Sequence, residues 1–232
     1  MNLRIKYGKT DLGKFVSHLD LLRAWERAFR RANIPIAFSQ GFNPHPRMSF
    51  GSALAVGVTS SGEYMDIVLK KETPIKEIKQ ALEKYLPQGL VIYDIEEISE
   101  QAQSLMSIIN RAKYVIKVKT LGTVTEEMLD NRIKDMLTQE KIEILRESKK
   151  GLKEKDIKEG VFEVKGRVIG EGFVELEVTV QTGSQGNVRP EEILQALEKC
   201  GLPLDLSVSQ IHRSGLFVGN DMGMVSPLSV KS

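Results

Sequence analysis

The chain has 232 residues, of which 41% are hydrophobic and 28% charged, values that are typical of a folded globular protein and exclude a disordered chain. There are 33 lysines and arginines against 31 aspartates and glutamates, so the net charge is only +2 and any affinity for nucleic acid must come from local clusters of charge. No apolar run approaches the roughly 20 residues that cross a bilayer, and the first residues lack the apolar centre of a signal peptide, so we expect a cytoplasmic protein without membrane contact.

The first elements of the chain are a strand and a helix. Alternating apolar and polar residues over 2–7 predict a half-buried strand. Ser17 is placed to cap a helix that Pro35 ends. The predicted apolar face of this helix consists of Leu22, Trp25, Phe29 and Ala32.

The next elements complete a first domain over residues 1–98. Residues 53–58 and 63–70 predict two strands joined by a hairpin turn at 59–62. A second helix begins at Thr73 and Pro74, and a last strand follows over residues 90–98. The order strand, helix, strand, strand, helix, strand is the split βαβ pattern of a ferredoxin-like domain.

The second half repeats this order of elements after a connector, with an inserted basic stretch. A capping box at Thr123 and Glu126 starts its first helix, and Pro190 starts its second. The predicted strands are residues 113–119, 141–148, the two strands of a hairpin over 160–180, and 206–218. The fold class is therefore α+β, with two tandem ferredoxin-like (split βαβ) domains over residues 1–98 and 111–218 and a flexible tail over 219–232.

Four arginines share one face of the first predicted helix. At 100° per residue they fall within a sector of roughly 100°, largely apart from the apolar face. Their planar guanidinium groups suit bidentate contact with phosphate, whereas pairing with Asp20 and Glu26 would make the same face an ordinary solvated one. The arginines are Arg23, Arg27, Arg30 and Arg31.

The loop after this helix, SQGFNPHPRMSFG, adds further groups that could contact an anion. Pro44 and Pro46 hold the residues before them extended, which gives the loop a shape and lowers the entropy lost on binding. Phe42 is either a core anchor or a platform on which a base stacks. The predicted phosphate contacts of the loop are Ser39, Gln40, Asn43 and Arg47.

His18 and His45 are the candidates for acid–base or metal chemistry. Neither has, along the sequence, the partners that a catalytic histidine or a zinc site needs, so no catalytic residue, metal or cofactor is expected. Glu63 and Asp66 are expected to form structural ion pairs, Glu63 with an arginine of the first helix. A basic loop with Lys149, Lys150 and Lys153 would extend the cationic surface.

Several of these segments together resemble a bacterial family of uncharacterised radical-SAM-linked proteins. The resemblance lies in KYGKTDLGKFVSHLD, RAFRRANIP, FSQGFNPHPRMSFG and ALAVGVTSSGEYMDI, and more weakly in SKKGLKEKDIK and GNVRPEEIL. It implies a functional link to a radical SAM enzyme encoded separately. This chain cannot itself hold the three-cysteine cluster of such an enzyme, because Cys200 is its one cysteine.

These observations predict a non-catalytic, RNA-binding accessory protein that works with a radical SAM enzyme in RNA modification or processing. The RNA would be a structured one such as transfer or ribosomal RNA. Two alternatives stay open. One is an RNA-processing ribonuclease of ferredoxin-like type with His18 or His45 as general base, and the other is a protein-interaction module that docks on the radical SAM partner.

Overall fold

The computed structural model describes residues 1–148, 151–170, 172–220 and 223–230. The chain forms two compact units, which we call unit 1 (Met1–Asn110 with Arg213–Ser232) and unit 2 (Arg111–His212). The boundary falls inside strand β10 (Leu204–Asn220), so the predicted second domain extends six residues beyond unit 2. Helices lie beside sheets in which the strand pairs β1–β3, β1–β4, β5–β9 and β8–β9 are antiparallel, which confirms the α+β class.

The sheet of unit 1 is built around its first strand. β1 (Asn2–Lys9) pairs antiparallel with β3 (Thr59–Val68) on one side and with β4 (Leu90–Ile98) on the other. β2 (Met48–Phe50) pairs with residues 65–67 of β3, and β10 is a neighbour of β3 in the sheet, with Ser214 and Gly215 beside Ser61 and Gly62. The strand order β4-β1-β3-β2 brings segments from across unit 1 together.

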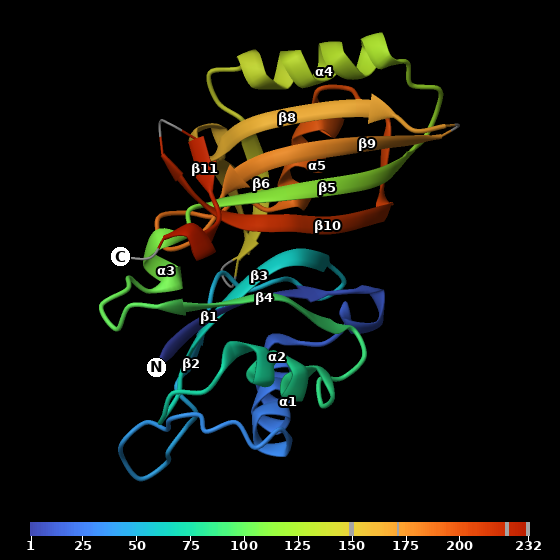
Figure 1. The fold of residues 1–232 in the computed structure, drawn as a ribbon. Helices are drawn as coiled ribbons and strands as arrows, with labels where there is room; N and C mark the ends of the chain where they lie inside the picture. Colours follow the sequence, from blue (N-terminus) through green and yellow to red (C-terminus); the bar gives the residue numbers. More distant parts are fainter. Residues whose placement is uncertain (149–150, 171, 221–222, 231–232) are drawn as a thin grey trace. The chain divides into compact units, whose positions relative to one another are not determined.

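Two helices cover one face of this sheet (Figure 1). They are α1 (His18–Arg31) and α2 (Ile75–Glu83). The buried side chains of α1 pack with those of α2 and the strands in one core. They are Leu21, Ala24, Trp25, Ala28 and Phe29. The buried face is therefore rotated about the helix axis relative to the predicted face, and Leu22 and Ala32 are only half-buried at its margin.

The start of α1 follows the prediction and its end does not. Ser17 is the N-cap, and its hydroxyl accepts a hydrogen bond from the Asp20 amide at 3.2 Å. The helix ends at Arg31, before Pro35, because Asn33 takes a left-handed conformation with φ of 55°. The Ile34 amide then donates to the Phe29 carbonyl at 3.0 Å, which closes the helix in a Schellman motif.

The predicted hairpin over residues 53–70 is wrong. Residues 53–58 form no strand, and the expected turn at 59–62 lies inside β3. Tertiary packing explains the small residues there: a Cβ at Gly62 would lie 2.5 Å from the Gly215 Cα of β10. The Ser60 hydroxyl also lies 2.9 Å from the Arg213 carbonyl of β10, a close approach that a local turn would not need.

The sheet of unit 2 has the order β10-β5-β9-β8, with the first half of β10 at its edge. The described strands beside it are β5 (Arg111–Thr120), β8 (Val161–Val168) and β9 (Phe173–Gln181). Helix α4 (Glu126–Thr138) packs against β8 and against α5 (Pro190–Lys199). Thr125, two residues after the predicted cap, accepts the Met128 amide and begins α4.

The predicted basic loop of unit 2 is instead a separate two-stranded hairpin. It consists of β6 (Glu143–Ser148) and β7 (Gly151–Asp156), which pair antiparallel. Lys153 therefore lies on a strand, with its side chain exposed. Lys149 and Lys150 lie outside the residues that the structure describes.

The end of the chain differs from the flexible tail that the sequence predicts. β11 (Gly223–Val225) pairs with residues 218–220 of β10, and a short 3-10 helix (Pro227–Ser229) follows. The Pro227 carbonyl accepts a hydrogen bond from Arg4 Nη1 of β1 at 2.9 Å. Residues 223–229 are thereby part of unit 1. The connector between the predicted domains likewise holds a short helix, α3 (Leu105–Ile108).

Two tandem ferredoxin-like domains remain a prediction, since the strand pairings show the α+β class and not that assignment. No helix in the described parts of the chain is both long and apolar enough to cross a membrane.

Candidate nucleic-acid interface

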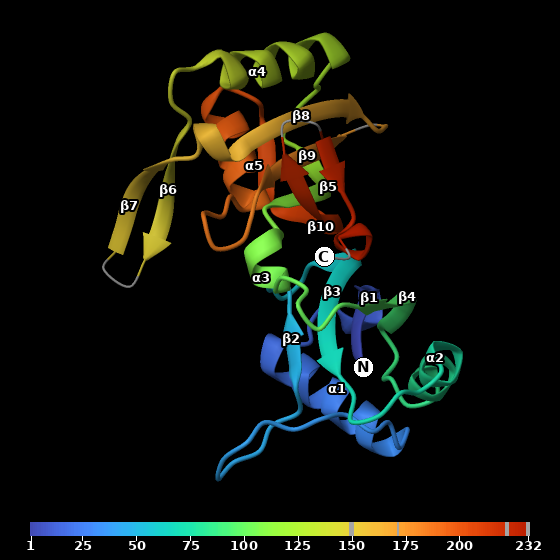
Figure 2. The ribbon, with the colours of Figure 1, turned by 60° about the vertical axis from the view of Figure 1, so that its left-hand side comes forward.

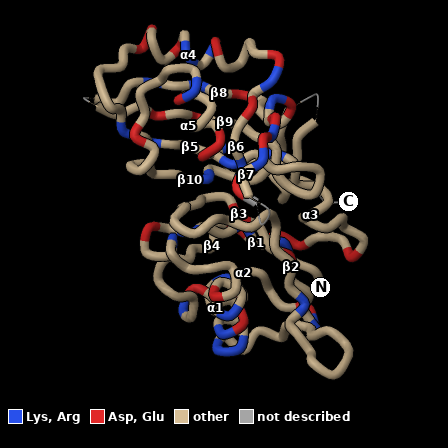
Figure 3. Tube along the Cα trace, turned by 180° about the vertical axis from the view of Figure 1, so that it is seen from behind, with Lys and Arg blue, Asp and Glu red and all other residues tan. Residues whose placement is uncertain are grey.

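The predicted arginines of α1 all lie on the surface, but they differ in what they contact. Arg23 forms an ion pair with Asp20 at 3.5 Å, and the Arg31 guanidinium lies 5.2 Å from the centre of the Tyr85 ring. Arg27 and Arg30 have no ion pair with any described carboxylate. Figure 3 shows these basic positions along α1. Arg30 and Arg31 lie in the last turn of α1, where their charges offset the negative end of the helix dipole. Arg27 lies before that turn, so its charge is offset neither by the dipole nor by a described carboxylate.

Residues 38–46, which we call the arm, project from unit 1 as a long loop (Figure 2). Backbone hydrogen bonds close the base of the arm, from the Arg47 amide to the Ala37 carbonyl at 2.7 Å and from the Ser39 amide to the His45 carbonyl at 2.8 Å. The Ser39 hydroxyl accepts the His45 amide at 3.0 Å, so this predicted phosphate contact shapes the arm itself.

The arm presents its predicted binding residues to solvent. Gln40, Asn43, His45 and the adjoining Arg47 are exposed. Phe42 is fully exposed, which excludes the core-anchor interpretation and leaves a free aromatic ring near Gly41, whose φ of 121° suits only glycine. An exposed ring on a shaped loop can stack on a base or insert into a protein partner.

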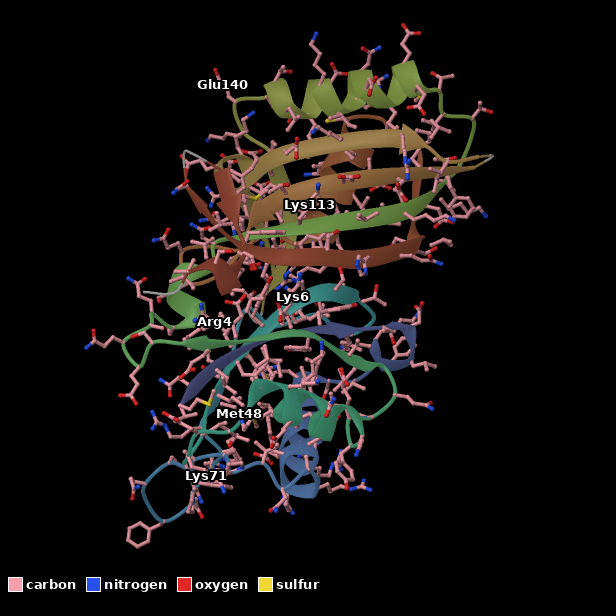
Figure 4. The ribbon with its side chains drawn as sticks, in the orientation of Figure 1. Arg4, Lys6, Met48, Lys71, Lys113 and Glu140 are labelled. Carbon is pink, nitrogen blue, oxygen red and sulfur yellow. The ribbon has the colours of Figure 1, made fainter. Side chains whose placement is uncertain are left out.

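A cleft of about 550 Å³ lies at the base of the arm. Arg30, His45, Lys70 and Lys71 line it, with Glu26 as the single carboxylate, so the cleft is basic. Figure 4 labels Lys71 near this end of unit 1. Phe38 forms part of the wall, and the Lys70 ammonium lies 5.4 Å from its ring centre.

The structure thus brings Arg30 and His45 together and adds residues that the sequence interpretation missed. Lys70 and Lys71 follow β3 after Leu69, and this pair of lysines at the end of a predicted strand was a signal for a basic site. Phe38 had no such signal, because its place on the cleft wall depends on how the chain turns at residues 34–38. Lys153 belongs to unit 2 and is not among the residues that line this cleft.

The contacts of the two candidate histidines are few among the residues that the structure describes. His18 is exposed at the start of α1, where its ring packs edge-on against Phe50 at a centroid distance of 5.7 Å. No carboxylate hydrogen-bonds to His18 or His45 among the described residues. In the same part of the chain, no three histidine, cysteine, aspartate or glutamate side chains come together to hold a metal.

A buried charged cluster lies under β3. Arg213 Nε donates to Glu63 Oε1 at 2.7 Å, and its Nη2 donates to Glu63 Oε2 and, at 2.9 Å, to the Ser52 carbonyl. Glu63 therefore pairs with Arg213 of β10 and not with an arginine of α1. Lys9, also buried, donates to the Val16 carbonyl at 2.8 Å. These contacts make the cluster a structural centre of unit 1.

Tyr7, beside this cluster, should make the free energy of unfolding fall as the pH becomes alkaline. Burial, and then the charge of Glu63, raise its pKa well above 10.0, so the folded state keeps the phenol protonated where the unfolded chain loses the proton. Its contribution is fully present below pH 10 and is lost as the pH rises further. We therefore expect urea unfolding between about pH 9 and 11 to show a steeper loss of stability for the wild type than for Tyr7→Phe.

The neighbouring Lys9 changes stability with pH in the opposite direction, and it is present in both the wild type and Tyr7→Phe. Desolvation lowers its pKa from 10.5, so its burial penalty fades as the pH rises toward that value. The difference between the two pH curves therefore isolates Tyr7. Parallel curves for wild type and Tyr7→Phe would contradict the prediction.

Comparison with known proteins supplies a family and little else. No curated protein matches the chain. Among solved structures, a chain of a Cbf5-Nop10-Gar1 complex is similar with a TM-score of 0.48 and 13% identity, over 94% of this chain and 50% of that one. The present chain thus spans about half the length of that neighbour, and at these values the likeness supports no argument about function. The sequence profile of one bacterial family matches residues 2–190, a range that includes α1, the arm and the cleft, and the description of that family does not mention radical SAM enzymes. The chain therefore belongs to the family described as "Uncharacterized protein conserved in bacteria (DUF2344)".

Proposed function

We propose that this protein binds RNA through unit 1, by the arginine face of α1, the arm and Arg47. The observation that carries the proposal is that Arg27 and Arg30, which form no ion pair with a described carboxylate, are exposed on the same unit as an arm with a fully exposed Phe42. Unpaired guanidinium groups neutralise phosphates, and an exposed aromatic ring offers a stacking surface to an unpaired base. A face that only contacts water would not favour an aromatic ring such as Phe42, because exposing apolar surface to water is unfavourable.

The remainder of the proposed function concerns fold and partner. We infer that both units are ferredoxin-like, because β4-β1-β3-β2 in unit 1 and β10-β5-β9-β8 in unit 2 follow one pattern of strand order. That fold hosts many activities and decides none of them. A radical SAM enzyme as the partner, with RNA modification as the shared task, rests on the sequence resemblance alone.

The charge contacts are tested by replacing Arg27 and Arg30 with alanine together. We measure binding of bulk transfer RNA to the full chain by fluorescence anisotropy at several salt concentrations between about 50 and 200 mM. Each lost phosphate contact removes roughly 0.7 to 0.9 from the slope of log affinity against log salt. The double variant should therefore bind more weakly and show a slope shallower by about 1.5.

The matched control removes two exposed lysines of unit 2, Lys134 and Lys141, which gives the same change in net charge. It should bind like the wild type. Equal weakening in both variants would indicate a global charge effect and contradict the proposed site, as would an absence of binding at low salt. RNA cleavage by the wild type that His18→Ala or His45→Ala abolishes would favour the ribonuclease alternative instead.

A further inference from the structure

The cleft at the base of the arm combines an aromatic wall with a basic rim. Its apolar lining comes from Ile34, Pro35, Ile36, Phe38, Pro44 and Pro46. Its volume of about 550 Å³ falls within the range of sites that hold a small organic ligand. The cleft is therefore large enough for one nucleotide and too small for a stacked duplex.

The charges around the cleft favour an anion. Neither Arg30 nor Lys71 forms an ion pair with a described carboxylate. The ammonium of Lys70 lies close to the Phe38 ring and so places positive charge beside the aromatic wall. Glu26 is the one acidic group of the lining, and a carboxylate there can accept a hydrogen bond from a base amino group or a ribose hydroxyl.

The shape of the cleft is held by backbone contacts at its floor. The Ala37 amide donates to the Val68 carbonyl at 2.7 Å, and the Lys70 amide donates to the Pro35 carbonyl at 2.8 Å. These bonds tie the segment that carries Phe38 to the end of β3, next to Lys71. A preformed wall and rim lower the entropy lost when a ligand binds.

We propose that this cleft binds one unpaired nucleotide of an RNA chain, with the base against Phe38 and a phosphate between Arg30 and Lys71. The proposal rests on the proposed function and deepens it, because it names the kind of RNA segment that is recognised. A base that is stacked within a duplex cannot enter the cleft, so single-stranded segments, loops and bulges are the substrates.

The first test compares two probes of about ten nucleotides each, a single strand with one central 2-aminopurine and the same strand annealed to its complement. The full chain should bind the single strand at least about tenfold more tightly. Binding should change the 2-aminopurine fluorescence of the single strand, because the probe base exchanges its neighbours for the Phe38 ring. Equal affinity for both probes would overturn the proposal.

The second test replaces Phe38 with alanine and uses Phe15→Ala as its matched control. Phe15 is likewise exposed, with the Lys14 ammonium 5.5 Å from its ring centre, but it does not line the cleft. Phe38→Ala should weaken binding of the single strand at least about fivefold and abolish the fluorescence change, while Phe38→Tyr retains both. An unchanged affinity and signal in Phe38→Ala would overturn the proposal.

The outcomes separate this proposal from the RNA-binding function itself. If transfer RNA binds with the expected salt dependence but both probes bind equally, the nucleotide cleft is wrong and the RNA-binding face stands. A third experiment titrates the full chain with AMP and with UMP. If either binds and depends on Phe38 and Lys71 while no RNA binds, the nucleotide chemistry of the cleft is supported and RNA binding is contradicted.

Discussion

Replacing Arg213 with methionine should lower the free energy of unfolding by about 3 to 5 kcal/mol. The guanidinium is buried, with 2% of its side chain exposed, and Glu63 opposite it is 4% exposed. Without Arg213 the Glu63 carboxylate would stay buried without an opposite charge. The Ser60 hydroxyl, which donates a hydrogen bond of 2.6 Å to Glu63 Oε1, is neutral and cannot replace the guanidinium. Urea unfolding followed by circular dichroism at neutral pH measures the loss.

An exposed pair on other strands supplies the control. Arg167 also forms an ion pair with a glutamate, Glu175, but 69% of its side chain is exposed, so Arg167→Met should cost no more than about 1 kcal/mol. The double variant Arg213→Met with Glu63→Leu should be more stable than Arg213→Met alone, because it removes the unpaired charge. Equal losses for Arg213→Met and Arg167→Met would contradict the assignment of a buried centre.

Replacing Arg4 with methionine should destabilise the protein by about 3 kcal/mol and release the end of the chain. Arg4 is fully buried on β1 and holds Asp66 with two hydrogen bonds of 2.7 and 2.9 Å. Its Nη1 also binds the Pro227 carbonyl at 2.9 Å. Hydrogen exchange should therefore accelerate in residues 223–229 more than in α1.

Lys6, two residues along β1, is the matched control (Figure 4). It is half-buried, and its ammonium lies 6.0 Å from the ring centre of Tyr93 rather than in a buried ion pair. Lys6→Met should change the free energy of unfolding by less than about 1 kcal/mol and leave exchange in residues 223–229 unchanged. If Arg4→Met left that exchange unchanged as well, Arg4 would not be what orders the end of the chain.

Local patterns in the sequence predicted those parts of the fold whose causes are local. Ser17 caps α1 as expected, because an N-cap and a helical face are set by residues a few positions apart. For the same reason the helical spacing predicted that the α1 arginines share one face, and all four lie on the surface. The order of strands and helices in the first half was also predictable, apart from the place of β2.

Parts of the fold and of the candidate site that depend on distant segments were not predictable. Ser60 and Gly62 read as a turn, yet they lie inside β3 because β10 approaches there. The partner of Glu63 lies 150 positions away, beyond the reach of any local pattern. Phe42 could be assigned to a core, the interpretation that the structure excludes, because one aromatic residue between polar neighbours has no periodicity that places it on a face.

The sequence by itself therefore determined the class of the fold, the start of α1 and the charge on its outer face, all of which follow from short-range spacing. The tertiary structure decided which charges stay unpaired, since ion pairs such as Arg213 with Glu63 form between segments that only folding brings together. It also decided that Phe38, Arg30 and Lys71 line one cleft, because three separate segments must meet to enclose a volume.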